Sequence, residues 1–231
     1  MNGKDIAKKL NISTTALKHY ERWGIIPEVK RASNGYRIYT KEHEVYFQCI
    51  RSLKNGFGMS FIKRVMPLFI KNDITSGLWM INHAQSQLQK DKDLVERTIK
   101  ILNLEDIENV KNTKDKKHKF SIGEVAKEAG VATSTIRHWE KEDLINPKRD
   151  MNSGFRVYNY LDLRRILVIK IIQNAVYSLE VVKETLSTIN ITDLKETRTI
   201  VEGSFEYLDY ILMEQTRGVA YVYKLIAYIS E

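Results

Sequence analysis

Hydroxyl, ammonium and guanidinium groups gather in a short N-terminal segment of the chain whose apolar spacing predicts a helix. Thr14, Thr15 and Lys18 lie near the start of this helix, and Arg37 lies beside a turn further along. Donors at the start of a helix can reach base edges and phosphates of a nucleic acid. A guanidinium beside a tight turn is suited to a phosphate contact. The segment therefore favours nucleic-acid contacts.

The same residue types recur further along the chain. Tyr20 and Tyr39 add hydroxyl donors to the first set, and His19 offers a further polar contact. The residues that we expect to contact DNA are Thr14, Thr15, Lys18, His19, Tyr20, Arg37 and Tyr39, with Thr133, Ser134, Arg137, His138, Arg156 and Tyr158 at the matching positions.

The sequence predicts neither catalysis nor metal binding. Ser13, Thr14 and Thr15 with His19 suggest a nucleophile and its base, but no third orienting group or oxyanion loop accompanies them, so we expect no enzyme activity and no catalytic residue. Cys49 lies in an apolar helical stripe, and an isolated thiol is a poor metal site. We expect neither a metal ion nor a cofactor.

The two sets belong to a tandem repeat. A module of about 65 residues occurs twice at an offset of 119 residues, with no gap from Ile6 and Val125 to Tyr39 and Tyr158. The identical residues are Ala7, Lys8, Thr14, His19, Glu21, Ile26, Gly35, Arg37 and Tyr39, which return as Ala126, Lys127, Thr133, His138, Glu140, Ile145, Gly154, Arg156 and Tyr158. The repeat predicts two domains.

Each module reads as a winged helix-turn-helix. In the first, short helices over 3–10 and 14–23 are separated by a turn in which Ser13 is a natural N-cap. A two-stranded wing over 29–39 turns at Gly35, which supplies the positive φ that a tight hairpin needs. A helix from Lys41 then ends at a break over 55–58. The second module repeats this plan, with helices over 121–129 and 133–142, Ser121 before the first of them, and a wing turn over 152–154.

Charge and composition agree with a nucleic-acid partner. The net charge is +8, and the first 70 residues carry 13 Lys and Arg against 5 Asp and Glu, whereas residues 119–190 carry 11 against 9. Local positive charge drives phosphate binding through counterion release, so we expect the first module to anchor more strongly. The sequence has no membrane-length apolar run and no signal peptide, and its single cysteine fits a reducing compartment. We expect a cytoplasmic, nucleoid-associated protein without a membrane partner.

A long helical pattern follows each module. Apolar residues over 76–103 predict a connector helix, and the polar run 111–118 is the best linker candidate. The tail from about 193 has a heptad seam with one polar position, Gln215. This seam must pack either on the same tail of a second chain or on residues 76–103 of its own chain, and we favour a homodimer. The expected oligomerisation residues are Phe205, Leu208, Leu212, Val219, Val222 and Ile226. We interpret the tail aromatics as packing residues, not as a ligand site.

The module motifs resemble the DNA-binding domain of the MerR family of bacterial transcription regulators. The resemblance rests on Ile-Ala-Lys from Ile6, on the run from Ser13 to Pro27, and on Asn-Gly-Tyr-Arg-Ile-Tyr from Asn34. It implies that the second helix of each module enters the major groove and that the wing follows the flanking backbone. It also implies a long helix that forms an antiparallel coiled coil in a homodimer, and activators that engage RNA polymerase.

Two features depart from the family pattern. Family members usually carry one such domain, whereas this chain carries two. Glu142 and Asp143 stand where the first module has Trp23 and Gly24, and acidic groups near a phosphate path weaken binding. The second module is therefore expected either to bind DNA less strongly or to serve another partner.

The predicted fold class is mainly α: two winged helix-turn-helix domains (1–70 and 119–190), a helical connector and basic linker (71–118), and a C-terminal coiled-coil helix (191–231). The favoured function is a sequence-specific transcription regulator whose two heads read spaced major-groove half-sites on double-stranded DNA. Two alternatives stay open: a DNA-bridging architectural or segregation protein, and a chain with one head on DNA and the second on a protein partner.

Overall fold

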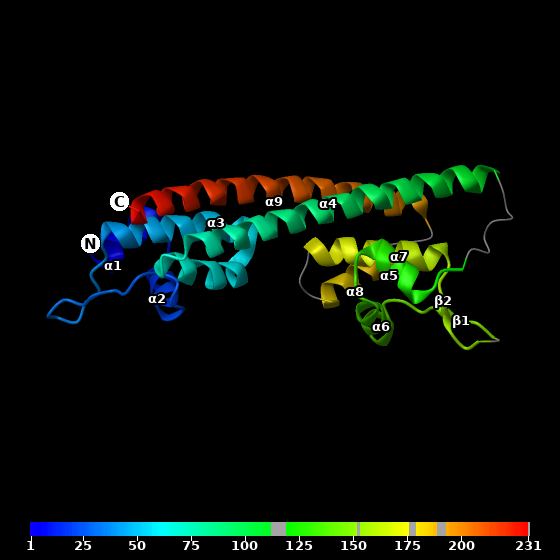
Figure 1. Cartoon of the computed structure of the whole chain (residues 1–231), viewed down its shortest axis with the longest axis horizontal. Coiled ribbons are helices and arrows are strands. Elements are labelled where there is room, and N and C mark those ends of the chain that lie inside the picture. The colour runs from blue at the N-terminus through cyan, green and yellow to red at the C-terminus, as the bar shows by residue number, and fades with distance from the viewer. Residues whose placement is uncertain (112–118, 152, 176–178, 189–192, 231) are drawn as a thin grey trace. The chain divides into compact units, whose positions relative to one another are not determined.

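The computed structural model describes residues 1–111, 119–151, 153–175, 179–188 and 193–230, and these are mostly helical (Figure 1). The mainly α fold class is confirmed. The chain forms two compact units. Unit 1 comprises Met1–Leu88 and Asp209–Glu231, and unit 2 comprises Gln89–Leu208. The units cut across the predicted domain boundaries, because the connector and the tail helix each contribute to both of them.

Unit 1 begins with the predicted helix-turn-helix. Helices α1 (Gly3–Leu10) and α2 (Thr14–Arg22) bury an apolar face that includes Ile6 and Leu17. The Ser13 hydroxyl accepts a hydrogen bond from the backbone N–H of Ala16 at 3.1 Å, so the predicted N-cap is confirmed. This cap satisfies one of the free N–H groups at the start of α2 and fixes where the helix begins.

The wing of unit 1 is less regular than we predicted. Gly35 has the predicted positive φ, at 80°. Instead of two strands over 29–39, a single bridge joins Arg31 to Arg37, supported by the bond from the Ile38 N–H to the Lys30 carbonyl at 2.8 Å. An isolated two-stranded ribbon is only marginally stable in water, which accounts for the short ladder.

Helix α3 (Lys41–Ile70) carries the core of unit 1 and contains the predicted break. Gly58 interrupts it with φ 76° and ψ 162°, a conformation that only glycine adopts readily. Before the break, Phe47, Ile50 and Leu53 are fully buried. Helix α4 (Ile74–Lys111) follows, and its Ile81 joins the same core.

Cys49, the single cysteine, lies in this core and reports on the folding of unit 1. Its side chain is fully buried, and burial raises the pKa of the thiol to about 12. Only a thiolate reacts readily with thiol reagents, so at pH 8 we expect no labelling of the folded unit except through opening of the core. Labelling kinetics with and without denaturant measure this. Labelling of the native chain at the rate of a free thiol would contradict the buried position.

Unit 2 repeats the plan of unit 1. It contains α5 (Ile122–Ala129), α6 (Thr133–Lys141), the antiparallel strands β1 (Lys148–Arg149) and β2 (Arg156–Val157), α7 (Tyr160–Ala175), α8 (Leu179–Thr188) and the first part of α9 (Leu194–Ile229). Ser121 caps α5 as predicted, in a capping box with Glu124.

The wing of unit 2 is one residue longer than that of unit 1: Ala32 pairs with Tyr36 in unit 1, whereas Asp150 pairs with Phe155 in unit 2. The gap-free alignment therefore does not carry through the wing.

Helices α2 and α6, each the second helix of its helix-turn-helix, which we call the recognition-like helices, also start differently. Ser13 caps α2, but its counterpart before α6 is Ala132, which makes no side-chain cap. We expect Ala132→Ser to raise the free energy of unfolding of unit 2 by about 1 kcal/mol, because a hydroxyl at an N-cap satisfies a free backbone N–H. Ser13→Ala should destabilise unit 1 by a similar amount. Denaturant unfolding of both variants measures the effects, and a destabilised Ala132→Ser chain would show that α6 does not start at Thr133.

The repeat extends into the long helices, which the sequence analysis did not detect. The pattern of buried and exposed positions over 91–102 of α4 is identical to that over 211–222 of α9, at an offset of 120 residues. The buried members are Leu94, Val95, Thr98 and Leu102 in α4, and Glu214, Gln215, Gly218 and Val222 in α9. Each compact unit thus combines one winged head with parts of both long helices.

The second part of α9 packs on α3 in unit 1, where Figure 1 shows its red end running alongside α3. The Gln215 side-chain amide donates to the Gly56 carbonyl at 3.0 Å, and Leu53 approaches Gly218. Val222 is buried in the same core, with Val219 and Ile226 packed against it. Contacts within the chain therefore cover Val222 and part of Val219 and Ile226, and an interchain role for these three residues stays a prediction. Neither partner that we considered for the tail was α3.

The rest of the predicted seam is mixed. Leu208 is buried and Phe205 half-buried within unit 2, but the Leu212 side chain in unit 1 is exposed. The tail aromatic residues divide in the same way. Tyr207, Tyr210 and Tyr223 are exposed, whereas Phe205, Tyr221 and Tyr228 are half-buried. Residues 112–118 of the predicted linker lie outside the described residues. None of the described helices is long and apolar enough to span a membrane.

Candidate DNA-binding surface of the two heads

The exposed face of each recognition-like helix carries the residues that the sequence singled out. We call residues 1–70 head one and 119–190 head two. In head one, Thr14, Thr15 and Lys18 are exposed on α2, while Leu17 is buried. Head two matches this, with an exposed set (Thr133, Ser134, Arg137 and His138) on α6 above buried Ile136 and Trp139. Helical spacing explains the division, because residues three and four apart share a face.

An arginine–glutamate ion pair ties each wing to its recognition helix, and in head one Arg31 of the wing also lies 3.9 Å from Glu21. Arg37 Nε lies 2.5 Å from Glu21 Oε2, and Arg156 Nε lies 2.6 Å from Glu140 Oε2. The hydrogen bond with the glutamate is the largest cause of the raised pKa of each arginine. We call this pair the wing brace. Sequence reasoning assigned both arginines to phosphate and missed their partners, although Glu21 and Glu140 are identical in the repeat.

Three predicted hydroxyl donors are also core residues. Tyr20, Tyr39 and Tyr158 are all buried side chains, and the Tyr158 hydroxyl is itself buried, so the role of the three as DNA contacts stays a prediction. Tyr20 and Tyr39 pack their rings against Phe47, at centroid distances of 6.0 and 5.7 Å. Burial is the largest cause of the raised pKa of each of the three. The spacing of Tyr20 from Leu17 already placed it on the apolar face.

A lysine contacts the C-terminal end of each recognition helix, from α3 in head one and from α8 in head two. In head one, Lys63 Nζ lies 4.0 Å from the centroid of the Trp23 ring, on which His19 also stacks. In head two, Lys183 Nζ lies 3.0 Å from Glu142 Oε2 and lowers the pKa of that carboxyl. Glu142 is therefore a paired charge, which weakens the argument that it repels phosphate.

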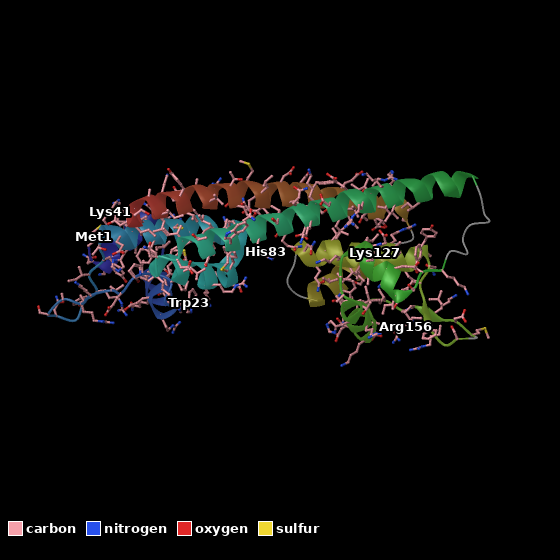
Figure 2. The ribbon with its side chains drawn as sticks, viewed as in Figure 1. Met1, Trp23, Lys41, His83, Lys127 and Arg156 are labelled. Carbon is pink, nitrogen blue, oxygen red and sulfur yellow. The ribbon has the colours of Figure 1, made fainter. Side chains whose placement is uncertain are left out.

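A groove lies between the recognition helix and the wing in each head. In head one it has a volume of about 950 Å³ and is lined by Lys4, Thr14, Lys18 and the wing turn. The corresponding groove in head two measures about 210 Å³, with Arg137, Arg149 and Arg156 in its lining. Figure 2 labels Arg156 in this head. Both grooves therefore present positive charge beside the exposed helix face.

The tips of both wings carry an exposed aromatic residue that sequence reasoning missed. The exposed fraction of Tyr36 is 72%, and that of Phe155 is 76%. The two occupy matching repeat positions, each directly after the glycine of the turn. The recurrence of an aromatic residue at this position could have indicated a functional role, because an exposed aromatic side chain at a wing tip has no core to fill.

Comparison with known proteins identifies the family of these heads. Residues 1–67 and 120–189 both match the family described as MerR HTH family regulatory protein. The chain belongs to the MerR family. The matched segments contain both recognition helices, both wings and both wing braces, so the family assignment covers each of the two heads.

Individual MerR relatives resemble this chain over part of their length. The HTH-type transcriptional regulator ZntR of Escherichia coli (strain K12) is 38% identical over 68 residues, which are 29% of this chain and 48% of ZntR. AdhR of Bacillus subtilis (strain 168) is 33% identical over 76 residues, 32% of this chain and 54% of AdhR. The mercuric resistance operon regulatory protein of Bacillus cereus is 32% identical over 104 residues, 45% of this chain and 66% of that protein. The chain thus spans about half the length of the first two relatives.

One solved structure also matches. It is a putative MerR family transcriptional regulator from Listeria monocytogenes, 20% identical, with a TM-score of 0.37, covering 49% of this chain and 87% of that one. Among the described residues, no group of three or more His, Cys, Asp and Glu side chains could hold a metal ion.

Proposed function

We propose that this chain is a DNA-binding transcription regulator in which each head reads one half-site in a major groove. The observation that carries the proposal is the repetition of one surface on two scaffolds. Both heads expose the N-terminal face of the second helix, and both hold the wing beside it with the same arginine–glutamate pair. Base edges are read by such helix faces, while the flanking groups position the head on phosphates.

The two half-sites are expected to differ. Lys18 in head one corresponds to Arg137 in head two, and Thr15 corresponds to Ser134. Arginine can bind a guanine edge through two parallel hydrogen bonds, whereas lysine presents a compact charge. The methyl group of threonine, which serine lacks, can contact the methyl group of thymine. A chain with two different faces is therefore expected to bind an asymmetric DNA site, in which the two half-sites have different sequences.

The test is selection of bound sequences from a random DNA library by the intact chain at physiological salt. We expect a motif of two unequal half-sites. In a second chain, Ser134→Thr, Thr135→Ala and Arg137→Lys copy the face of α2 onto α6, and this chain should select two copies of one half-site. It should bind the original site at least about fivefold more weakly. Enrichment without any motif would contradict sequence-specific reading and favour the DNA-bridging alternative.

The uneven charge favours a second candidate function, in which head two binds a protein instead of DNA. Head one carries 13 basic against 5 acidic residues, and head two carries 11 against 9. This alternative predicts that Lys18→Ala weakens DNA binding and that Arg137→Ala does not. Comparable losses from both would exclude it. RNA polymerase is the partner that the family assignment suggests for an activator.

A homodimer through α9 now depends on the exposed side of that helix. Leu212 and Met213 expose 49% and 64% of their surface in unit 1. We expect the chain to sediment as a dimer at micromolar concentration and Leu212→Asp to sediment as a monomer, because a charge in a closely packed apolar interface is costly. If the wild-type chain sediments as a monomer, α9 packs only within its own chain and the homodimer is excluded at that concentration.

A further inference from the structure

A polar surface cavity of about 340 Å³, open to solvent, lies in unit 1 between α3 and the second part of α9, with Leu10 of α1 at its edge. Helix α3 contributes Gln48, Arg51, Ser52 and Asn55, which share one face of that helix. Helix α9 contributes Glu214, Arg217 and Tyr221, which share a face in the same way. The cavity belongs to neither recognition surface, and nothing in the proposed function uses it.

Unit 2 has apolar residues at some of the corresponding positions, although the counterparts of Arg51 and Asn55 are the polar residues Lys170 and Asn174. Gln48 and Ser52 of α3 correspond to Leu167 and Ile171 of α7, both buried. Glu214 of α9 corresponds to buried Leu94 of α4. Apolar side chains can therefore occupy these positions in this fold.

Among the polar lining residues Glu214 is buried and Gln48, Ser52 and Tyr221 are half-buried, whereas Arg51, Asn55 and Arg217 are exposed. The polar choice therefore costs stability mainly at Glu214 and, to a smaller extent, at Gln48 and Ser52. Buried polar groups cost free energy unless they are hydrogen-bonded, and departures from a well-packed core concentrate at functional sites. Next to the cavity, the side-chain oxygen Oε1 of Gln215 is buried and has no hydrogen-bond partner among the described residues. Its counterpart in unit 2 is Val95, which has no polar atom to satisfy. At Gln48, Ser52, Glu214 and Gln215 the polar residues are therefore a feature of unit 1 and not of the shared fold.

The charges in the lining indicate what the cavity would hold. Arg51 is exposed and forms no ion pair with any described residue, so its guanidinium is available to a ligand. Arg217 Nη1 lies 2.7 Å from Glu214 Oε1, and the second carboxylate oxygen of Glu214 accepts from the Asn55 amide at 3.0 Å. The acidic group is therefore already satisfied from both sides. Arg51, together with the hydroxyls of Ser52 and Tyr221, leaves an excess of donors.

We propose that this cavity binds a small organic anion, a metabolite carrying a carboxylate or phosphate group, with Arg51 as its principal contact. Guanidinium groups bind both anions through paired hydrogen bonds, and the volume suits a molecule of metabolite size. Such a ligand would touch both α3 and α9 and would strengthen the attachment of the tail helix to head one. Any effect on DNA binding rests on the proposed function, but anion binding does not.

The experiment uses Cys49, which lies on α3 between Gln48 and Arg51, as the reporter of opening in unit 1. Labelling of the intact chain is followed at pH 8 with inorganic phosphate or with succinate, each against sodium chloride at equal ionic strength. A ligand that binds only the folded unit slows labelling by a factor of 1 + [L]/Kd, about elevenfold at ten times Kd. We expect slowing in the millimolar range with at least one of the two probes. The probe that acts distinguishes phosphate from carboxylate recognition, and slowing by neither would overturn the proposal.

Three variants separate binding in the cavity from a general salt effect. Arg51→Gln should abolish the slowing. Ser52→Ile copies unit 2, fills the cavity, and should also abolish it while leaving unit 1 at least as stable. The matched control is Lys170→Gln, since Lys170 is the counterpart of Arg51 in unit 2 and contacts Asn174 there. This control should keep the full response. Equal slowing in wild type and Ser52→Ile would overturn the proposal. These outcomes do not depend on DNA binding, so they are separable from failure of the proposed function.

Discussion

Gly56→Ala is expected to lower the free energy of unfolding of unit 1 by about 2 kcal/mol, the middle of the range for overpacking a tight contact. A Cβ atom on Gly56 would lie 2.5 Å from the backbone nitrogen of Gln215 and 2.8 Å from the carbonyl carbon of Glu214. Both are backbone atoms of α9, so no side-chain rotation relieves the clash. Helix α9 must move away from α3, which also stretches the bond from the Gln215 amide to the Gly56 carbonyl.

Two measurements check this prediction. Denaturant unfolding should show an earlier transition for unit 1, and Cys49 should label faster at pH 8 by about thirtyfold, which is the rate ratio that 2 kcal/mol represents. Gly203→Ala is the matched control, because Gly203 lies in α9 and a methyl group added there would have no atom within 4 Å. It should be neutral or stabilising by up to about 1 kcal/mol, since alanine favours helix over glycine. An unchanged Gly56→Ala chain would mean that α9 does not pack on α3.

Local signals in the sequence predicted much of the fold, because they act over a few residues. Ser13 and Ser121 mark helix starts through bonds to N–H groups three residues away, and Gly58 marks a break through its own φ. The exposed faces of α2 and α6 followed from helical spacing. For the same reason Tyr20 should have been placed in the core. Its residue type was weighed above its position.

The features that the sequence did not predict are contacts between residues far apart in the chain. Gln215 and Gly56 are 159 positions apart, and no periodicity in α9 indicates which surface covers it. A heptad seam shows that a partner exists but does not identify that partner. The tail seam therefore predicted a second helix, whereas the glycines of α3 and α9 permit a close approach within the chain. The wing brace was similarly hidden, because Glu21 and Arg37 belong to elements that meet only after folding.

Arg37→Ala is expected to weaken DNA binding roughly tenfold without changing its salt dependence, and Glu21→Gln is expected to weaken it too. A charge-assisted hydrogen bond contributes enough to hold the wing in place, and either substitution removes it. Because Glu21 compensates the charge of Arg37, the loss of this arginine should release no phosphate contact of its own. The double variant should be no weaker than Arg37→Ala, as expected for two residues that act through one contact.

Lys18→Ala provides the comparison, since an exposed lysine on the helix face should take part in counterion release. Its loss should lower the slope of log affinity against log salt by about one. If Arg37 instead binds phosphate directly, two results reverse: Arg37→Ala lowers the slope by about one, and Glu21→Gln tightens binding because an acidic group leaves the DNA surface. Titrations at several salt concentrations with all four chains separate the two roles. Arg156 and Glu140 repeat the same geometry in head two, so the same pair of substitutions there shows whether that head uses its wing on DNA at all.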